Sequence, residues 1–233
     1  MTTLLMLGSA PMALDARDWS RDRFDTVLAI NNAHLIRPDW DYMIHPWDYP
    51  ADQVPRAIPS QQIITEADFV PAQNAFGGFV YAGATMAFTA GYWALHALRP
   101  NVIAAFGCDM HYPASGPTHF YGNGTADPLR ADITLRSLEA KSARLMVLAA
   151  RHGTALVNLS SGPSRLIFPR AELADAADAR PAAYSESLAD QALAQEAALG
   201  YFVASGRYWD HPTRFDPAEL DALDALWRAA AQV

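Results

Sequence analysis

The chain has 233 residues, of which 51% are hydrophobic and 18% charged, so it is not a disordered chain and can bury a substantial core. Its formal net charge of −8 argues against a broad nucleic-acid-binding face, but backbone amides could still hold a small anionic ligand. No apolar stretch could span a bilayer, and the first residues lack the basic segment of a signal peptide. The single cysteine, Cys108, excludes an intrachain disulfide, so a cytoplasmic location is expected.

The first third of the chain predicts strands that end in polar residues. An apolar run at residues 3–7 ends at Gly8 and Ser9, with a proline at position 11, which is typical of a strand, a glycine turn and a helix start. A second strand at residues 25–30 ends in Asn31 and Asn32, and shorter strands are expected at 41–45 and 61–65. Ligands of open α/β sheets bind beyond such strand ends, although each polar residue could equally be a turn former.

Two long helices are predicted in the middle of the chain. The first, residues 79–98, follows Gly77 and Gly78, whose lack of a side chain suits close approach of the backbone to a ligand. The second, residues 130–152, is expected to have a basic outer face with Arg136, Lys141 and Arg144.

Between these helices lies the segment with the most chemistry. An apolar run at residues 102–106, bounded by Pro100 and Gly107, predicts a buried parallel strand. The loop after it carries an acid and two imidazoles, at Asp109, His111 and His119. These three are the candidate catalytic residues, whereas Cys108 is expected to be a small buried residue rather than a nucleophile.

A further strand at residues 154–159 completes the pattern, which predicts an α/β fold with a Rossmann-like, doubly wound and mostly parallel sheet over residues 1–168. From residue 169 the composition becomes rich in alanine, and residues 169–233 are expected to form a helical carboxyl-terminal cap on the sheet or a dimer surface. Helical patterns there run over about 170–179, 185–204 and 217–231.

With these motifs the chain resembles the Rossmann-like superfamily of bacterial CMP-sialic-acid-dependent sialyltransferases. It also resembles the related domain-of-unknown-function 115 proteins, which include 6-hydroxymethylpterin diphosphokinases. The stretch from Gly8 to Met12 is similar to their first strand-end motif, Asn31 or Asn32 to their strand-end asparagine, and Gly107-Cys108-Asp109 to their Gly-x-Asp. The resemblance covers roughly residues 3–168.

The resemblance implies a glycosyltransferase-like reaction, from a nucleotide-activated sugar such as a CMP-sugar to a hydroxyl acceptor, without a metal. His119 would take the place of the general base and Asp109 would orient a ribose or the acceptor. The residues expected to contact the nucleotide are Gly8, Ser9, Asn31, Asn32, Gly77, Gly78, Tyr112 and Tyr121.

Three alternatives remain open from the sequence. A diphosphokinase-like phosphotransferase would use Mg²⁺ held by Asp109 with Asp127 or Asp132. A non-catalytic nucleotide-binding module is a second alternative, because the first glycine motif is incomplete. A zinc hydrolase built on Asp109, His111 and His119 is the third, although spacing this loose is common by chance.

Overall fold

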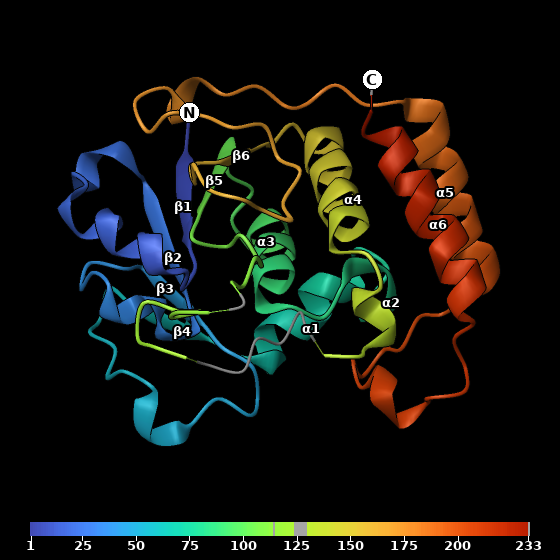
Figure 1. Cartoon of the computed structure of the whole chain (residues 1–233), viewed down its shortest axis with the longest axis horizontal. Helices are drawn as coiled ribbons and strands as arrows, with labels where there is room; N and C mark the ends of the chain where they lie inside the picture. The colour runs from blue at the N-terminus through green and yellow to red at the C-terminus, as the bar shows by residue number, and fades with distance from the viewer. Residues whose placement is uncertain (114, 124–129, 233) are drawn as a thin grey trace.

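The computed structural model describes residues 1–113, 115–123 and 130–232, and it shows a single sheet of six parallel strands (Figure 1). The strand order is β4-β3-β2-β1-β5-β6. From β1 the chain adds β2, β3 and β4 on one side, and it then crosses back to add β5 and β6 on the other side. The order of the strands therefore reverses between β1 and β5. This confirms the predicted α/β, Rossmann-like architecture with a parallel sheet. The strands are β1 (Thr3–Leu7), β2 (Thr26–Ile30), β3 (Tyr42–Ile44), β4 (Gln62–Ile64), β5 (Val102–Phe106) and β6 (Ala155–Asn158).

The two faces of the sheet are covered by different kinds of segment. Helices α1, α3 and α4 bury the larger hydrophobic core against one face, and short 3₁₀ segments cover the other (Figure 1). The α-helices are α1 (Glu66–Asn74), α2 (Phe79–Ala82), α3 (Met86–Ala97), α4 (Leu138–Arg151), α5 (Glu186–Leu199) and α6 (Pro217–Ala230). The 3₁₀ segments are η1 (Pro11–Asp18), η2 (Arg21–Arg23), η3 (Asn31–Leu35), η4 (Ala51–Gln53), η6 (Ile133–Leu135), η7 (Ala176–Asp178) and η8 (Tyr208–Asp210).

The helix predicted over residues 79–98 is divided in two. Gly83 has a φ of 85° and ends α2, and Thr85 then caps α3 by accepting a hydrogen bond from the backbone N–H of Phe88. The predicted helix 130–152 is likewise shorter, because Ser137 caps α4 at its start. In the segment predicted as helix 170–179, the structure forms only η7. Helix α1 was not predicted, although Thr65 and Asp68 form a capping box before it.

The prediction of a basic outer face on the second long helix is wrong for two of its three residues. Lys141 and Arg144 are buried, because α5 and α6 pack over α4 (Figure 1). Lys141 Nζ donates to Asp224 Oδ1 at 2.8 Å, and Arg144 Nε donates to Glu196 Oε1 at 2.7 Å. The carboxyl-terminal helices therefore cover the helix layer rather than the sheet itself.

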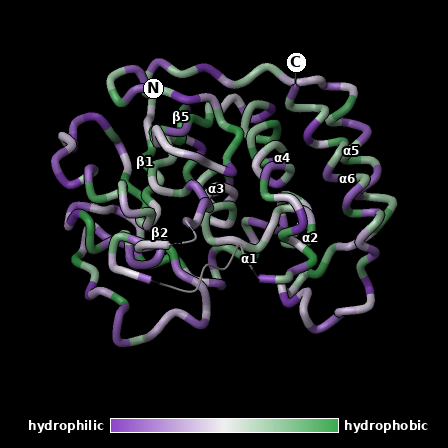
Figure 2. Tube along the Cα trace, in the orientation of Figure 1, coloured by the Kyte–Doolittle hydropathy of each residue, from purple (hydrophilic) through white to green (hydrophobic). Residues whose placement is uncertain are grey.

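The hydropathy of the residues in the carboxyl-terminal helices matches their packing on the helix layer. In α6 the buried residues recur every three to four positions, and hydrophobic and hydrophilic residues alternate along α5 and α6 (Figure 2). The buried core is continuous from Leu4 in the sheet to Trp227 in α6. In the described part of the chain, no helix has both the length and the apolar character needed to cross a membrane.

Candidate functional site

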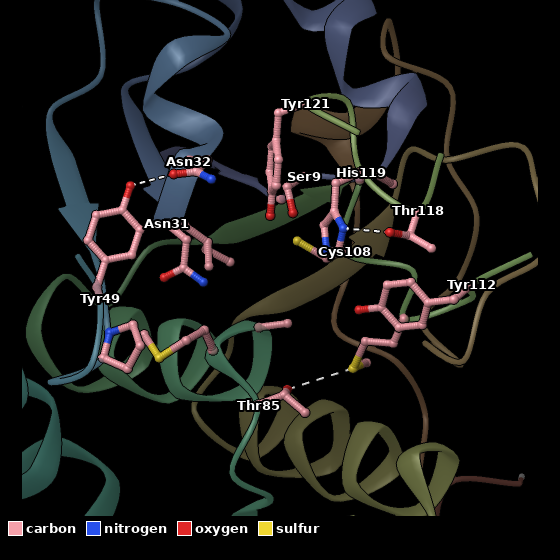
Figure 3. A pocket seen from close by; sticks show the side chains of 18 of the residues that line it. Ser9, Asn31, Asn32, Tyr49, Thr85, Cys108, Tyr112, Thr118, His119 and Tyr121 are labelled. Atoms are coloured by element: carbon pink, nitrogen blue, oxygen red, sulfur yellow. Dashed lines mark hydrogen bonds between the residues drawn. The ribbon is translucent and has the colours of Figure 1, made fainter. Parts of the chain in front are cut away.

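A cavity of about 540 Å³ opens at the carboxyl ends of β1, β2, β3 and β5, beside the point where the strand order reverses (Figure 3). This is the position where open α/β sheets bind their ligands. Its lining comes from Gly8, Ser9 and Ala10 after β1, Ile30, Asn31 and Asn32 at the end of β2, Pro46, Asp48, Tyr49, Pro50 and Gln53 after β3, Thr85, Met86 and Ala87 at the start of α3, and Gly107, Cys108, Met110, His111, Tyr112, Thr118, His119 and Tyr121 after β5.

The turn after β1 packs tightly on the end of β5. Gly8 donates its N–H to the carbonyl of Phe106 at 2.8 Å, and a Cβ added at Gly8 would lie only 2.3 Å from the carbonyl oxygen of Gly107. The carbonyl of Ser9 in turn accepts the N–H of Phe120 at 3.0 Å, which joins this turn to the loop after β5. Gly8 is therefore required by backbone packing, in addition to any contact with a ligand.

Replacing Gly8 by Ala is expected to lower the free energy of unfolding by roughly 1–3 kcal/mol, because the new methyl group must push two backbone segments apart. Urea unfolding followed by circular dichroism measures this loss. Gly162→Ala is the matched control, since a Cβ at Gly162 meets no heavy atom within 4 Å. Equal stability of the two variants would contradict the close packing of β1 on β5.

The asparagines after β2, which were expected to contact a nucleotide, both line the cavity. Asn31 has a positive φ of 50°, and its Oδ1 is buried without a hydrogen-bond partner among the described residues. Asn32 Oδ1 accepts a hydrogen bond from the hydroxyl of Tyr49 at 2.5 Å. Met110, which also lines the cavity, has a positive φ of 49°. Left-handed conformations of residues other than glycine are uncommon and concentrate at functional sites, which favours this cavity as one.

The helix that begins at the cavity is α3, and not the helix that was expected to begin after Gly77 and Gly78. Met86 and Ala87 line the cavity in the first turn of α3, where backbone N–H groups have no acceptor within the helix. Their N–H groups and the helix dipole favour a negatively charged or electron-rich group there. Gly77 and Gly78 are not brought to the cavity, because they pack against Arg144 and Phe202 respectively.

His119 forms part of the cavity wall and is only 8% exposed. Its Nδ1 lies 2.9 Å from the hydroxyl of Thr118, and its ring stacks on that of Tyr121 with centroids 4.9 Å apart (Figure 3). The ring of Tyr112 lies on another side, with its centroid at 5.7 Å. His111 also lines the cavity but is exposed. The structure therefore brings both predicted histidines to the site and fixes the orientation of His119.

Asp109 lies behind the cavity wall rather than on it. It is 4% exposed, and its Oδ1 accepts a hydrogen bond from Asn158 Nδ2 at 3.1 Å. Its carbonyl accepts the N–H of Arg165 at 2.8 Å, so Asp109 joins the end of β5 to the segment after β6. Asp127, the other residue considered with it as a magnesium ligand, lies outside the described residues.

Asp132, the third candidate magnesium ligand, is bound by protein groups. It accepts hydrogen bonds from the N–H and hydroxyl of Thr134, at 2.8 and 2.7 Å, and from the hydroxyl of Tyr208 at 2.6 Å. Burial alone would raise the pKa of Asp132, but these hydrogen bonds and the nearby Arg130 hold it below its usual value. Asp132 therefore has a structural role at the start of η6.

Replacing Asp132 by Asn is expected to lower the free energy of unfolding by roughly 1–2 kcal/mol at neutral pH. A carboxyl whose pKa is lowered by folding contributes stability above its unfolded pKa of about 4, and this contribution disappears as the pH falls through the folded value. The difference from the natural chain should thus shrink in acid, as measured by urea unfolding at several pH values. Asp210→Asn, at an exposed carboxylate, should change stability little at any pH.

Two other titratable groups of the cavity are held neutral. Burial, assisted by the neighbouring carboxylate of Asp109, raises the pKa of Cys108. This agrees with the prediction that Cys108 is a packing residue rather than a nucleophile. Burial, and then the nearby hydroxyl of Tyr121, raises the pKa of Tyr49 to about 12. Both groups are therefore uncharged at neutral pH and act as hydrogen-bonding or apolar surface.

The cavity has little fixed charge. Its described lining residues include no lysine or arginine, and the one acidic residue among them is Asp48. Nor do three His, Cys, Asp or Glu side chains cluster closely enough to hold a metal ion anywhere in the described ranges. Hydroxyl groups, amides and imidazoles dominate, which suits a polar ligand with few negative charges.

Comparisons of the chain with protein-family models, with curated proteins and with solved structures give no match.

Several residues of the cavity were not predicted as site residues. Tyr49 belongs to the sequence Pro-Trp-Asp-Tyr-Pro that follows β3. Its position just after the end of a strand is the feature of the sequence that could have identified it as a site residue. Thr85 comes two residues after Gly83. A glycine is typical of the end of one helix, and a threonine soon after it is typical of the N-cap of the next. Thr118 and Met110 carried no signal of their own, because the loop after β5 has no periodicity to orient its side chains.

Proposed function

We propose that this chain transfers a sugar from a nucleotide-activated donor, with a CMP-sugar the first to test, to a hydroxyl group of an acceptor. The observation that carries the proposal is the position of His119: an oriented imidazole, nearly buried, in the wall of a cavity at the switch point of a parallel sheet. An imidazole there is suited to general-base chemistry near neutral pH.

In the proposed reaction the acceptor oxygen attacks the anomeric carbon of the donor sugar. His119 takes the proton of that hydroxyl as the new carbon–oxygen bond forms. The bond between the anomeric carbon and the phosphate oxygen breaks, and the nucleotide leaves with the electron pair. The N–H groups at the start of α3 and the hydroxyl groups of Ser9, Tyr112 and Tyr121 would stabilise the negative charge on the departing phosphate.

The lining of the cavity favours this reaction over the diphosphokinase alternative. A nucleoside triphosphate carries more negative charge than a sugar nucleotide, yet the described lining offers it no lysine or arginine. Lys141, the one lysine of the sequence, is bound to Asp224 in the core. Asp109 and Asp132, proposed as magnesium ligands, are not among the described lining residues, and each accepts a hydrogen bond from a protein side chain.

A thermal-shift screen of CMP, CDP, UDP, GDP and ATP, each with EDTA and with Mg²⁺, tests the proposal. We expect CMP to raise the melting temperature in EDTA, because a ligand at a hundred times its Kd stabilises the folded state by about 2.7 kcal/mol. A shift that only ATP with Mg²⁺ produces would favour the diphosphokinase. Binding of CMP without turnover of any CMP-sugar would favour a non-catalytic module, and no shift with any nucleotide would contradict the proposed donor.

A further inference from the structure

The start of α3 at the cavity is held by residues outside that helix. Ala84 comes directly before Thr85, the N-cap of α3. Its N–H donates to Thr134 Oγ1 at 3.1 Å, and its carbonyl accepts a hydrogen bond from Arg130 Nη2 at 3.4 Å. Because α2 ends at Gly83, no continuous helix fixes Ala84 from the preceding side. The segment that contains Arg130 and Thr134 therefore sets the place at which α3 begins.

Thr85 joins the start of α3 to the loop after β5. Its hydroxyl forms a hydrogen bond to Met110 Sδ at 3.7 Å, and both residues line the cavity (Figure 3). Met86 and Ala87, the next two residues of the chain, also line it. A shift of Ala84 would thus be passed on to several parts of the cavity wall.

The hydroxyl of Thr134 is oriented by Asp132. It has one proton, which it donates to Asp132 Oδ1 at 2.7 Å, so that its lone pairs are left to accept the N–H of Ala84. The other carboxylate oxygen, Oδ2, accepts the hydroxyl of Tyr208 at 2.6 Å. Thr134 and Tyr208 are both buried, so water has little access to compete for these hydrogen bonds.

Tyr208 belongs to the carboxyl-terminal segment and not to the cavity. It lies in η8, between α5 and α6, 76 residues after Asp132, and it is not among the described lining residues. Burial, and then the hydrogen bond to Asp132, raises the pKa of Tyr208 to about 12, so its hydroxyl keeps the proton and remains a donor at neutral pH. A distant part of the chain therefore helps to orient the Asp132 carboxylate.

We propose that Tyr208 is a positioning residue of the cavity: its hydroxyl, acting through Asp132 and Thr134, holds the first turn of α3 in place. The carboxyl-terminal region then contributes to ligand binding without touching the ligand. The proposal rests on the proposed function in one respect, that the group received by the N–H groups of this turn is the phosphate of a nucleotide. The hydrogen bonds that hold the turn do not depend on which ligand binds.

Hydrogen exchange of the full chain, resolved at single amides by NMR, tests the positioning without any ligand. Tyr208→Phe should speed exchange at the N–H groups of Ala84 and Phe88 by about three- to tenfold more than at the amides of β5, as the loss of one buried hydrogen bond does. Tyr201→Phe is the matched control, because it also removes a hydroxyl from the segment between α5 and α6, where Tyr201 Oη accepts the N–H of Asp216. It should leave the exchange at Ala84 and Phe88 within about twofold of that in β5.

A pair of Thr134 variants tests the route. Thr134→Val removes the hydroxyl and should speed the exchange of the Ala84 N–H, whereas Thr134→Ser keeps a hydroxyl and should restore slow exchange. Adding Tyr208→Phe to Thr134→Val should produce no further change at Ala84, since effects that pass through one residue are not additive. Full additivity of the two substitutions would overturn the proposed route.

Isothermal titration with CMP then connects the helix start to ligand binding. We expect Tyr208→Phe to weaken CMP binding by about three- to tenfold, and Tyr201→Phe to leave the affinity within about twofold. The positioning role is overturned if both tyrosine variants exchange alike at Ala84 and Phe88, or if exchange is faster in Tyr208→Phe while CMP binds equally well. If the natural chain does not bind CMP, the proposed donor is contradicted, and the exchange at Ala84 alone decides whether Tyr208 holds the turn.

Discussion

Replacing His119 by Asn is expected to lower the rate of sugar transfer by roughly 10²–10⁴-fold, the usual contribution of a general base. Asparagine keeps a polar atom near the position of Nδ1, where Thr118 lies at 2.9 Å, but it cannot take a proton from the acceptor. The variant should therefore fold and bind the nucleotide while losing the chemical step. Single-turnover assays with the donor identified by the thermal-shift screen measure this loss.

Two further measurements separate a catalytic role of His119 from a structural one. The thermal shift produced by the nucleotide should be the same in the variant and in the natural chain. The fall in rate at acid pH that an imidazole base produces should also disappear. His96→Asn, at an exposed histidine in the last turn of α3, serves as the control and should retain full activity. An unchanged transfer rate in His119→Asn would remove the mechanism proposed here.

The strands could be predicted from the sequence because each one is a short apolar run between residues that end it. The run at 102–106, between Pro100 and Gly107, became β5 with the same bounds, and the run at 3–7 became β1. Parallel strands buried on both faces are hydrophobic throughout, so the local sequence is sufficient to identify them. Since parallel strands end at one edge of the sheet, the polar residues that follow them were predicted together.

The partners of charged residues could not be predicted in the same way. Lys141 and Arg144 lie in a helix whose local pattern favours exposure, and they are buried by α5 and α6, which come far later in the chain. The direction of the Asp109 side chain depends similarly on Asn158, 49 residues away. The cases of Lys141, Arg144 and Asp109 are each decided by a contact between segments that are distant in the sequence. Gly77 and Gly78 were expected at the cavity for a local reason, because residues 79–98 were predicted as one helix and Gly83 divides it.

The buried ion pair that joins these segments is where a substitution should cost most stability. Glu196 accepts hydrogen bonds from Arg144 Nε and Nη2, both at 2.7 Å, and from Trp227 Nε1 at 2.8 Å. Arg144 Nη1 also donates to the hydroxyl of Tyr92 at 2.7 Å. Burial by itself would lower the pKa of Arg144, but the Glu196 carboxylate and Tyr92 outweigh it and raise that pKa. Arg144 is therefore charged in the core, and Glu196 is the group that neutralises it.

Replacing Glu196 by Gln is expected to lower the free energy of unfolding by about 3–5 kcal/mol, because it leaves the guanidinium of Arg144 buried without its counter-charge. Urea unfolding at neutral pH measures the loss, and an unchanged slope would show that the unfolding transition is still the same one. The matched control is Asp190→Asn on the same helix α5, which breaks an ion pair to the same helix α4. That pair, between Asp190 and Arg151, is exposed and should contribute no more than about 1 kcal/mol.

The comparison of the two variants also tests how the carboxyl-terminal helices are attached. If Glu196→Gln lowers the free energy of unfolding no more than Asp190→Asn does, Arg144 is open to water. That result would contradict the structure, in which α5 covers Arg144. If the cost is several times larger, α5 and α6 belong to the same cooperative unit as the sheet. Arg144 binds Tyr92 in α3, and α3 begins at the cavity, so loss of this network should also loosen that helix. A weaker nucleotide shift in Glu196→Gln than in Asp190→Asn would then show that the cap supports the site from the opposite side of the helix layer.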